Sequence, residues 1–235
     1  MIGLELNGAR VAFSTRQGGV SQAPYNSLNL GILTDDDQTR VTENRRRLAE
    51  ALQLDPKRIA MGWQVHGTDL KEWGAPPDRG GFAHAGADLP RVDGHATGER
   101  HLALLVLAAD CLPVALASKD RVAMLHCGWR GLAGGILERA VETFPEPPAA
   151  ALGPCIEQCC YEVGHEVLEA FAAVPQAADG RMLSLRTVAR TKLEGAGVTQ
   201  IKNVGLCTSC REDLFFSHRR DDGVTGRQAG MIWRT

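Results

Sequence analysis

Seven consecutive apolar residues, Leu102–Ala108, constrain the fold of this chain more than any other segment. Hydrophobic and polar residues do not alternate there, so the run predicts a strand that is covered on both faces. A second apolar run, Val122–Leu125, follows after a short interval. Two such strands need further layers of structure on either side of them. The segment therefore predicts a layered protein in which this part of the chain lies deep inside.

Helices and strands alternate irregularly along the rest of the chain. Val41–Leu52 predicts a helix and Ile59–Val65 a strand, on the spacing and length of their apolar residues. Trp73–Gly98, rich in glycine, proline and aspartate, predicts a long loop, and Met231–Trp233 a closing edge strand. This order does not fit repeated βαβ units. We predict a single α+β domain over residues 1–235, with mixed β-sheets stacked and flanked by helices.

The composition is that of a soluble globular protein, with 44% hydrophobic and 23% charged residues. The formal net charge of −2 gives no general attraction to nucleic acid or to an anionic membrane. No apolar window reaches the roughly 18 residues of a membrane span, and the first six residues lack the features of a signal peptide. We therefore expect a cytoplasmic protein, a monomer or homodimer. Its seven cysteines are expected to be free thiols, metal ligands or both.

Three potential metal ligands follow predicted strands at the point where each strand ends. Cys111 and His126 come after the two apolar runs, and His66 comes after the predicted strand 59–65. A strand holds its terminal side chains firmly, so such ends can present ligands to one point. One thiolate and two imidazoles suit zinc, with copper as a competitor, and three protein ligands leave a coordination position open for catalysis. Alternatively, these are core residues, because a buried free cysteine behaves as a small hydrophobe.

Short motifs recur in order from one end of the chain to the other. They are Phe13–Ser21, Tyr25–Gly31, Asn44–Arg45, Gln64–Gly67, Val92–Gly94, Ala109–Pro113, His126–Gly131, Gly153–Ile156, Cys160–Gly164, Phe216–Asp221 and Thr225–Gln228. Their order and coverage resemble the multicopper polyphenol oxidase, or laccase-domain, family, which is related to bacterial peptidoglycan editing factors. The resemblance implies stacked sheets between helical layers, as in cysteine hydrolases, and a metal triad at His66, Cys111 and His126. It also implies zinc-dependent phosphorolysis of adenosine, inosine, guanosine and methylthioadenosine, with accompanying adenosine deamination.

Several other residues are candidates for contact with the purine nucleoside and phosphate that this resemblance implies. Arg16 in a glycine-rich turn and Arg130 at the start of a helix would hold phosphate, since a guanidinium binds it through two parallel hydrogen bonds. Gln64 and Asn44, within two of the motifs, are further candidates for substrate contacts. Two aspartates would assist proton transfer, orient a metal ligand or be structural: Asp93 and Asp110.

Two other functions remain alternatives. Cys111 and His126 could act without metal as nucleophile and base, hydrolysing amides such as those of muropeptide precursors, and His66 would then have no role. Copper-dependent oxidation of phenols, the family's older label, is the second. A laccase needs roughly ten histidine ligands plus a cysteine for its copper centres, whereas this chain has seven histidines in all.

A pair of cysteines near the end of the chain, Cys207 and Cys210, has the CxxC spacing of metal and redox sites. A zinc site of this kind needs a second pair of ligands. Only Cys155, Cys159 and Cys160 remain to supply it, and the family resemblance implies no second metal. The role of the CxxC pair stays undecided from the sequence.

Overall fold

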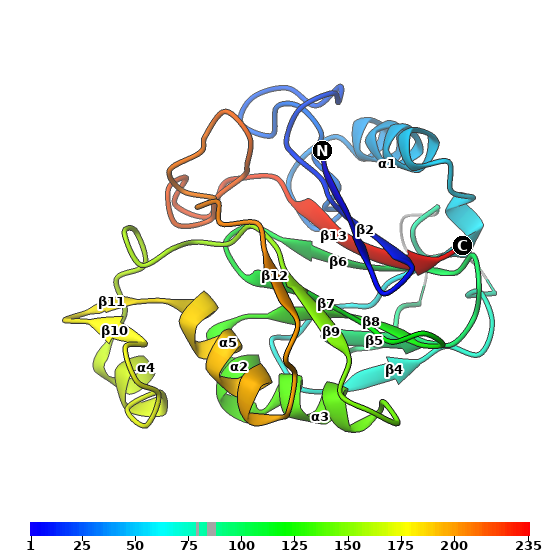
Figure 1. Ribbon diagram of the computed structural model, residues 1–235. Coiled ribbons are helices and arrows are strands. Elements are labelled where there is room, and N and C mark those ends of the chain that lie inside the picture. The colour runs from blue at the N-terminus through cyan, green and yellow to red at the C-terminus, as the bar shows by residue number, and fades with distance from the viewer. Residues whose placement is uncertain (79, 84–87) are drawn as a thin grey trace.

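Two β-sheets lie face to face between layers of helices in the computed structural model of this protein, which describes residues 1–78, 80–83 and 88–235 (Figure 1). The larger sheet has six strands in the order β12-β9-β7-β8-β5-β4. Their bounds are Ile201–Asn203, Ala149–Leu152, Leu112–Ala117, Val122–Cys127, Gly94–Thr97 and Leu70–Glu72. The two outermost pairs are parallel and the inner pairs antiparallel, so this sheet is mixed.

The second sheet has five strands in the order β1-β2-β13-β6-β3. Their bounds are Ile2–Leu6, Ala9–Phe13, Gln228–Arg234, Ala103–Ala108 and Ile59–Ala60. Only the β3–β6 pair is parallel. A separate hairpin consists of β10 (Ala178–Asp179) and β11 (Met182–Leu183). The predicted α+β class with stacked mixed sheets is confirmed.

Helices cover the outer face of each sheet (Figure 1). Helix α1 (Gln38–Leu52) packs Leu48, Ala49 and Leu52 against the five-stranded sheet. Helices α2 (Trp129–Gly134), α3 (Ile136–Glu142) and α5 (Leu185–Gly195) pack against the six-stranded sheet, whereas α4 (His165–Ala170) lies farther out. Helix α1 begins earlier than predicted because the carboxylate of Asp37 caps it, accepting a hydrogen bond from the backbone N–H of Thr39.

The central core lies between the two sheets. Val11, Leu104 and Ile232 of the five-stranded sheet meet Ala115 and Met124 of the six-stranded sheet there, all of them buried. The absence of alternation in 102–108 is explained, because β6 contacts α1 on one face and the six-stranded sheet on the other. A glycine, Gly230 of β13, lets the sheets approach, since a Cβ at that position would collide with Met124.

Three predicted elements differ from the structure. Of the predicted strand 59–65 only Ile59–Ala60 pairs, and the residues that follow instead line a cavity. In the predicted loop 73–98, residues 94–97 form β5, an inner strand whose polar His95 obscured the pattern, while residues 79 and 84–87 lie outside the described part. The predicted edge strand 231–233 is the middle of β13, which pairs with β2 and β6 on its two sides.

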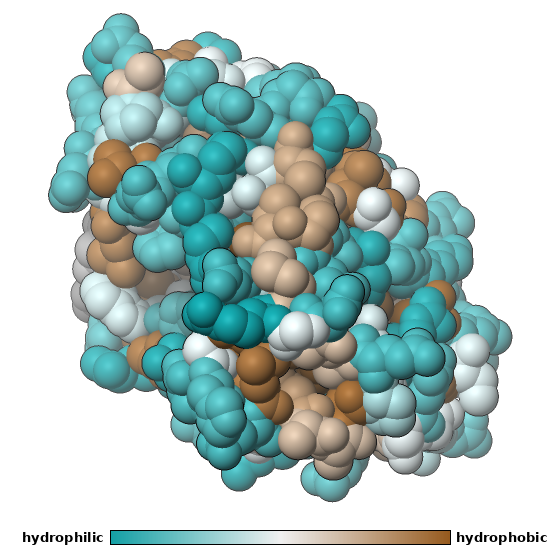
Figure 2. Space-filling model, turned by 90° about the vertical axis from the view of Figure 1, so that its left-hand side faces the viewer, coloured by the Kyte–Doolittle hydropathy of each residue, from teal (hydrophilic) through white to brown (hydrophobic). Residues whose placement is uncertain are grey.

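The surface is mostly hydrophilic on the side turned toward the viewer in Figure 2, where apolar side chains gather in separate patches. Within the described residues, none of the helices combines the length and apolar character that crossing a bilayer requires.

Candidate metal site and adjoining cavity

The side chains of His66, Cys111 and His126 converge on one point. One potential ligand atom from each lies within 4.8 Å of the others, and the two imidazole rings meet edge to face with centroids 4.8 Å apart. His126 is on β8, Cys111 lies in the bend just before β7, and His66 is in the loop that follows β3. Because β7 and β8 are paired neighbours, their ends bring two of the three side chains together. The arrangement offers one sulfur and two nitrogens to a metal ion.

Asp93, just before β5, holds in place the loop that carries His66 and the side chain of His126 on β8. Its carboxylate accepts hydrogen bonds from the backbone N–H groups of Val65, His66 and Gly67, at 3.0, 2.9 and 2.7 Å. It also accepts one from Nδ1 of His126 at 2.8 Å, which leaves Nε2 of that ring to face the site. Burial on its own raises the pKa of Asp93, but these hydrogen bonds lower it below the usual value. One buried carboxylate therefore orients both histidines.

Charge in the site is concentrated on Cys111 and His126. Burial alone raises the pKa of the Cys111 thiol, but the charge of His126 and hydrogen bonds from both histidines outweigh it and lower this pKa to about 6. Burial alone lowers the pKa of His126, but the Cys111 thiolate and Asp93 raise it to about 9. The two histidines therefore favour the thiolate of Cys111, the form that binds metals and attacks electrophiles.

A glycine, Gly128, borders the site at the point where β8 leads into α2. A Cβ built there would lie 3.0 Å from Cδ2 of His66 and 3.1 Å from Sγ of Cys111. Space beside the three side chains thus depends on the absence of a side chain at this position. The ligand types, their convergence, the carboxylate behind one histidine and this space all fit a metal ion.

A cavity of about 480 Å³ adjoins the site and is lined by all three side chains. This volume is within the roughly 300–1,000 Å³ of sites that hold small molecules. Aromatic and apolar side chains form much of the wall, including Trp63, Trp129 and Tyr161. The cavity can therefore place a flat, largely apolar group beside the metal ligands.

Three of the other predicted site residues line this cavity: Arg130, Gln64 and Asp110. The Arg130 guanidinium lies over the Trp129 ring, 4.4 Å from its centroid, and has no hydrogen-bond partner among the described residues. The Gln64 amide is bound at both ends to the backbone of Leu107, at 2.7 Å each. Arg130 is thus available to a ligand, whereas Gln64 fastens its loop to the end of β6.

Both carboxylate oxygens of Asp110 already accept hydrogen bonds. Oδ1 accepts one from the Thr208 hydroxyl at 2.6 Å, and Oδ2 accepts one from the backbone N–H of Arg219 at 2.7 Å. Asp110 itself has a positive φ of 91° in the bend before Cys111. It therefore joins two distant loops at the cavity wall, and its predicted catalytic role stays a prediction.

The structure does not bring Arg16 or Asn44 into this cavity. The Arg16 guanidinium donates to Asn26 and to the backbone carbonyl of Glu212. The Asn44 amide is buried in α1, where it accepts from the backbone N–H of Val20 and donates to Ser21 and Asn29. Their polar groups hold loops together, and this placement does not support the predicted contacts with phosphate and substrate.

The cavity residues that were not predicted from the sequence as parts of the site include four polar side chains: Tyr161, His218, Arg219 and Arg227. They come from loops far along the chain from the three metal-ligand candidates. The Arg219 guanidinium lies over the Tyr161 ring, 5.1 Å from its centroid, and donates to the backbone carbonyl of Glu162 at 2.7 Å. The motif 216–221 supplies His218 and Arg219, and was the available signal for these two residues. With Arg130, these arginines give the cavity a cationic part of its lining.

Comparisons with known proteins agree with the resemblance. Residues 10–235 match the family described as multi-copper polyphenol oxidoreductase laccase. The chain is 40% identical to purine nucleoside phosphorylase PA4543 of Pseudomonas aeruginosa, over 95% of this chain and 93% of that protein. It is 41% identical to purine nucleoside phosphorylase YfiH of Escherichia coli, over 96% and 94%. The crystal structure of YlmD from Geobacillus stearothermophilus superposes with a TM-score of 0.91 at 37% identity, covering 97% of this chain and 93% of that one.

Proposed function

The chain belongs to the multi-copper polyphenol oxidoreductase laccase family, and from this premise we propose that it cleaves purine nucleosides with phosphate. Relatives about 40% identical to it carry the name purine nucleoside phosphorylase. One observation carries the proposal. A single cavity contains the His66–Cys111–His126 group and an arginine whose guanidinium has no partner among the described residues.

The arginines that line the cavity are proposed to bind phosphate. None of the described residues accepts a hydrogen bond from the Arg130 guanidinium, which can bind two phosphate oxygens at once. Arg219 and Arg227 are held by backbone carbonyls and contribute fixed positive charge. Cleavage of the bond between the purine and the ribose C1′ develops oxocarbenium character, and a phosphate anion held beneath C1′ stabilises that charge. Arg130 is thus proposed as the residue that positions phosphate, in place of Arg16.

The purine is proposed to lie against the aromatic wall. Trp63 and Tyr161 present flat surfaces in the cavity, and stacking needs no particular base. Such a wall can bind adenosine, inosine, guanosine and methylthioadenosine alike, because all four have a purine ring. Binding there excludes water from the reacting bond, since the apolar side chains displace it.

His66, Cys111 and His126 are proposed to hold zinc, with copper as a competitor for the same site. Zinc bound there would act as a Lewis acid toward an oxygen of the substrate, and could also support accompanying deamination of adenosine. Asp93 is proposed as a positioning residue, because it fixes the ring of His126 and the backbone around His66. Asp110 is proposed to position Arg219 through its backbone N–H.

The test is phosphate-dependent release of hypoxanthine from inosine, with zinc content measured on the same samples. Wild type is expected to hold zinc and to need phosphate, and Cys111→Ala to lose both zinc at this site and activity. Cys127→Ala is the matched control, since this neighbouring buried thiol packs in the core on the other face of β8. Arg130→Ala should raise the KM for phosphate with little change in the KM for inosine.

A second candidate function has a specific observation in its favour. Cys111 lies beside His126, whose charge lowers the pKa of its thiol, and this is the arrangement of a cysteine nucleophile and its base. A metal-free amide hydrolase has no need of His66. If purified wild type holds no zinc at this site, releases no hypoxanthine and is alkylated selectively at Cys111, the phosphorylase proposal fails and the hydrolase replaces it.

A further inference from the structure

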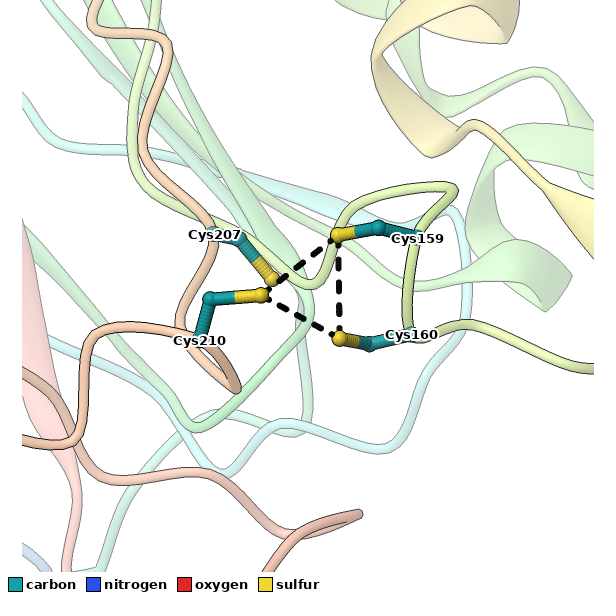
Figure 3. Close-up of side chains that lie close together, drawn as sticks. All are labelled: Cys159, Cys160, Cys207 and Cys210. Carbon is teal, nitrogen blue, oxygen red and sulfur yellow. Dashed lines mark hydrogen bonds between the residues drawn. The ribbon is translucent and has the colours of Figure 1, made fainter.

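Four cysteines outside the cavity form a second cluster of potential metal ligands. Cys159 and Cys160 lie in the loop that follows β9, and Cys207 and Cys210 lie in the turn that follows β12. Figure 3 shows their side chains pointing toward one another from these two segments. The segments are joined nearby by a β-bridge between Cys155 and Cys207. Residues some fifty positions apart in sequence are therefore brought side by side by the sheet.

The spacing of the sulfur atoms suits a tetrahedral metal ion. Sγ of Cys210 lies 3.5 Å from that of Cys159 and 3.4 Å from that of Cys160, which are 3.6 Å from each other. All four sulfurs lie within 4.8 Å of one another. A zinc–sulfur bond of about 2.3 Å places neighbouring sulfurs of a tetrahedron about 3.8 Å apart. A disulfide would need about 2.05 Å between two of them and would leave the other two unbound.

The chemistry of the group also favours a soft cation. A thiol is a weak hydrogen-bond donor and acceptor, so thiol–thiol contacts give little reason for four of them to converge. Cys207 Sγ accepts a hydrogen bond from the backbone N–H of Glu157 at 3.4 Å, an interaction that stabilises a thiolate ligand. The turn around Cys207 and Cys210 is itself held by Arg220, which donates to the backbone carbonyls of Thr208 and Ser209.

We infer that Cys159, Cys160, Cys207 and Cys210 bind one Zn²⁺ ion, separate from the one proposed in the cavity. Four thiolates complete the tetrahedron and leave no position for substrate, so this zinc is structural. Each cysteine loses its proton to solvent as the zinc–sulfur bonds form. No change of oxidation state is involved.

The position of the cluster indicates a structural role for the ion at the cavity. Tyr161, which lines the cavity, directly follows Cys160, and Thr208, whose hydroxyl binds Asp110, lies between Cys207 and Cys210. Zinc in the cluster would tie these two segments together. It would thereby fix one wall of the cavity without touching the substrate.

The experiment measures the number of zinc ions per chain by inductively coupled plasma mass spectrometry, on protein purified with a thiol reductant. Wild type should hold two zinc ions per chain, and Cys111→Ala one. Cys159→Ser with Cys210→Ser should also hold one, retained at the cavity site. Cys155→Ala is the matched control and should keep two, because this thiol lies in the same loop but donates to Glu157. The count at the cluster does not depend on nucleoside activity, so the two proposals fail separately.

A second measurement keeps the inference falsifiable if the double variant does not fold. Cys111→Ala, which leaves the cluster intact, is loaded with Co²⁺, and its absorption should show the intense sulfur-to-cobalt charge transfer of several thiolates. Absence of that band, or a Cys111→Ala protein with no zinc and four titratable cluster thiols, overturns the inference. So does a disulfide between any two of the four in freshly purified protein.

Discussion

Replacement of Asp93 by asparagine is the most informative single change at the cavity site. The two carboxylate oxygens of Asp93 accept four hydrogen bonds, two on each oxygen. An asparagine amide of the same shape has one oxygen and one NH₂ group, so two of the four donors would face another donor. A buried donor left without an acceptor costs about 1–3 kcal/mol, so the change should cost about 2–6 kcal/mol in total.

The same change should also lower the affinity of the site for metal. Loss of a partner behind a ligating histidine lowers metal affinity about 10–100-fold, which corresponds to about 1.4–2.7 kcal/mol. The assay is competition for zinc against a chromogenic chelator, together with urea unfolding of the metal-free protein. Asp69→Asn is the control, since this nearby carboxylate is 77% exposed and lies 3.5 Å from the guanidinium of Arg139. Unchanged zinc affinity and unchanged stability in Asp93→Asn would refute the positioning role.

Three further predictions concern the core and the space around the site. Burial lowers the pKa of His95 from 6.5 to about 4. Between these two pH values the unfolded chain takes up a proton at His95 and the folded protein does not, so the free energy of unfolding decreases as pH falls from about 6.5 to about 4. The loss should reach about 3 kcal/mol by urea unfolding at low pH and be absent in His95→Gln. Gly128→Ala should crowd His66 and Cys111 and lower zinc content without changing the melting temperature of the metal-free protein; a normal zinc content would contradict this. Leu116→Ala, in the fully buried part of β7, should cost about 2–5 kcal/mol, and a loss below about 1 kcal/mol would contradict the packing described.

The layered architecture could be predicted because its central strands are apolar on both faces. A run such as 102–108, of strand length and without alternation, indicates burial on both faces, and the structure buries β6 between α1 and the six-stranded sheet. The middle position of β13 could not be predicted, because strand order is decided by pairing between distant segments. Strand β5 was missed for a different reason. Nδ1 of the buried His95 and the hydroxyl of the buried Thr97 are hydrogen-bonded to Trp73, and this tertiary contact offsets part of the cost of burying polar groups.

The convergence of His66, Cys111 and His126 was predicted from strand ends, and the structure brings these side chains together. Strand ends carry that information because neighbouring strands share an edge. Arg16 and Arg219 show where such reasoning stops. A glycine-rich turn suggested a phosphate site for Arg16, but its guanidinium is occupied by loop carbonyls. Arg219 reaches the cavity through a contact with Asp110 that is 109 residues away in sequence.

The place of β13 between β2 and β6 also has a consequence for synthesis of the protein. On a ribosome, β2 and β6 emerge long before residues 228–234, and each then presents an unpaired edge toward the other. The half of the molecule built on the six-stranded sheet has all its strands by residue 203. The two sheets are thus completed at different times. The cavity, whose wall includes Arg227, can form only after nearly all of these 235 residues have been translated.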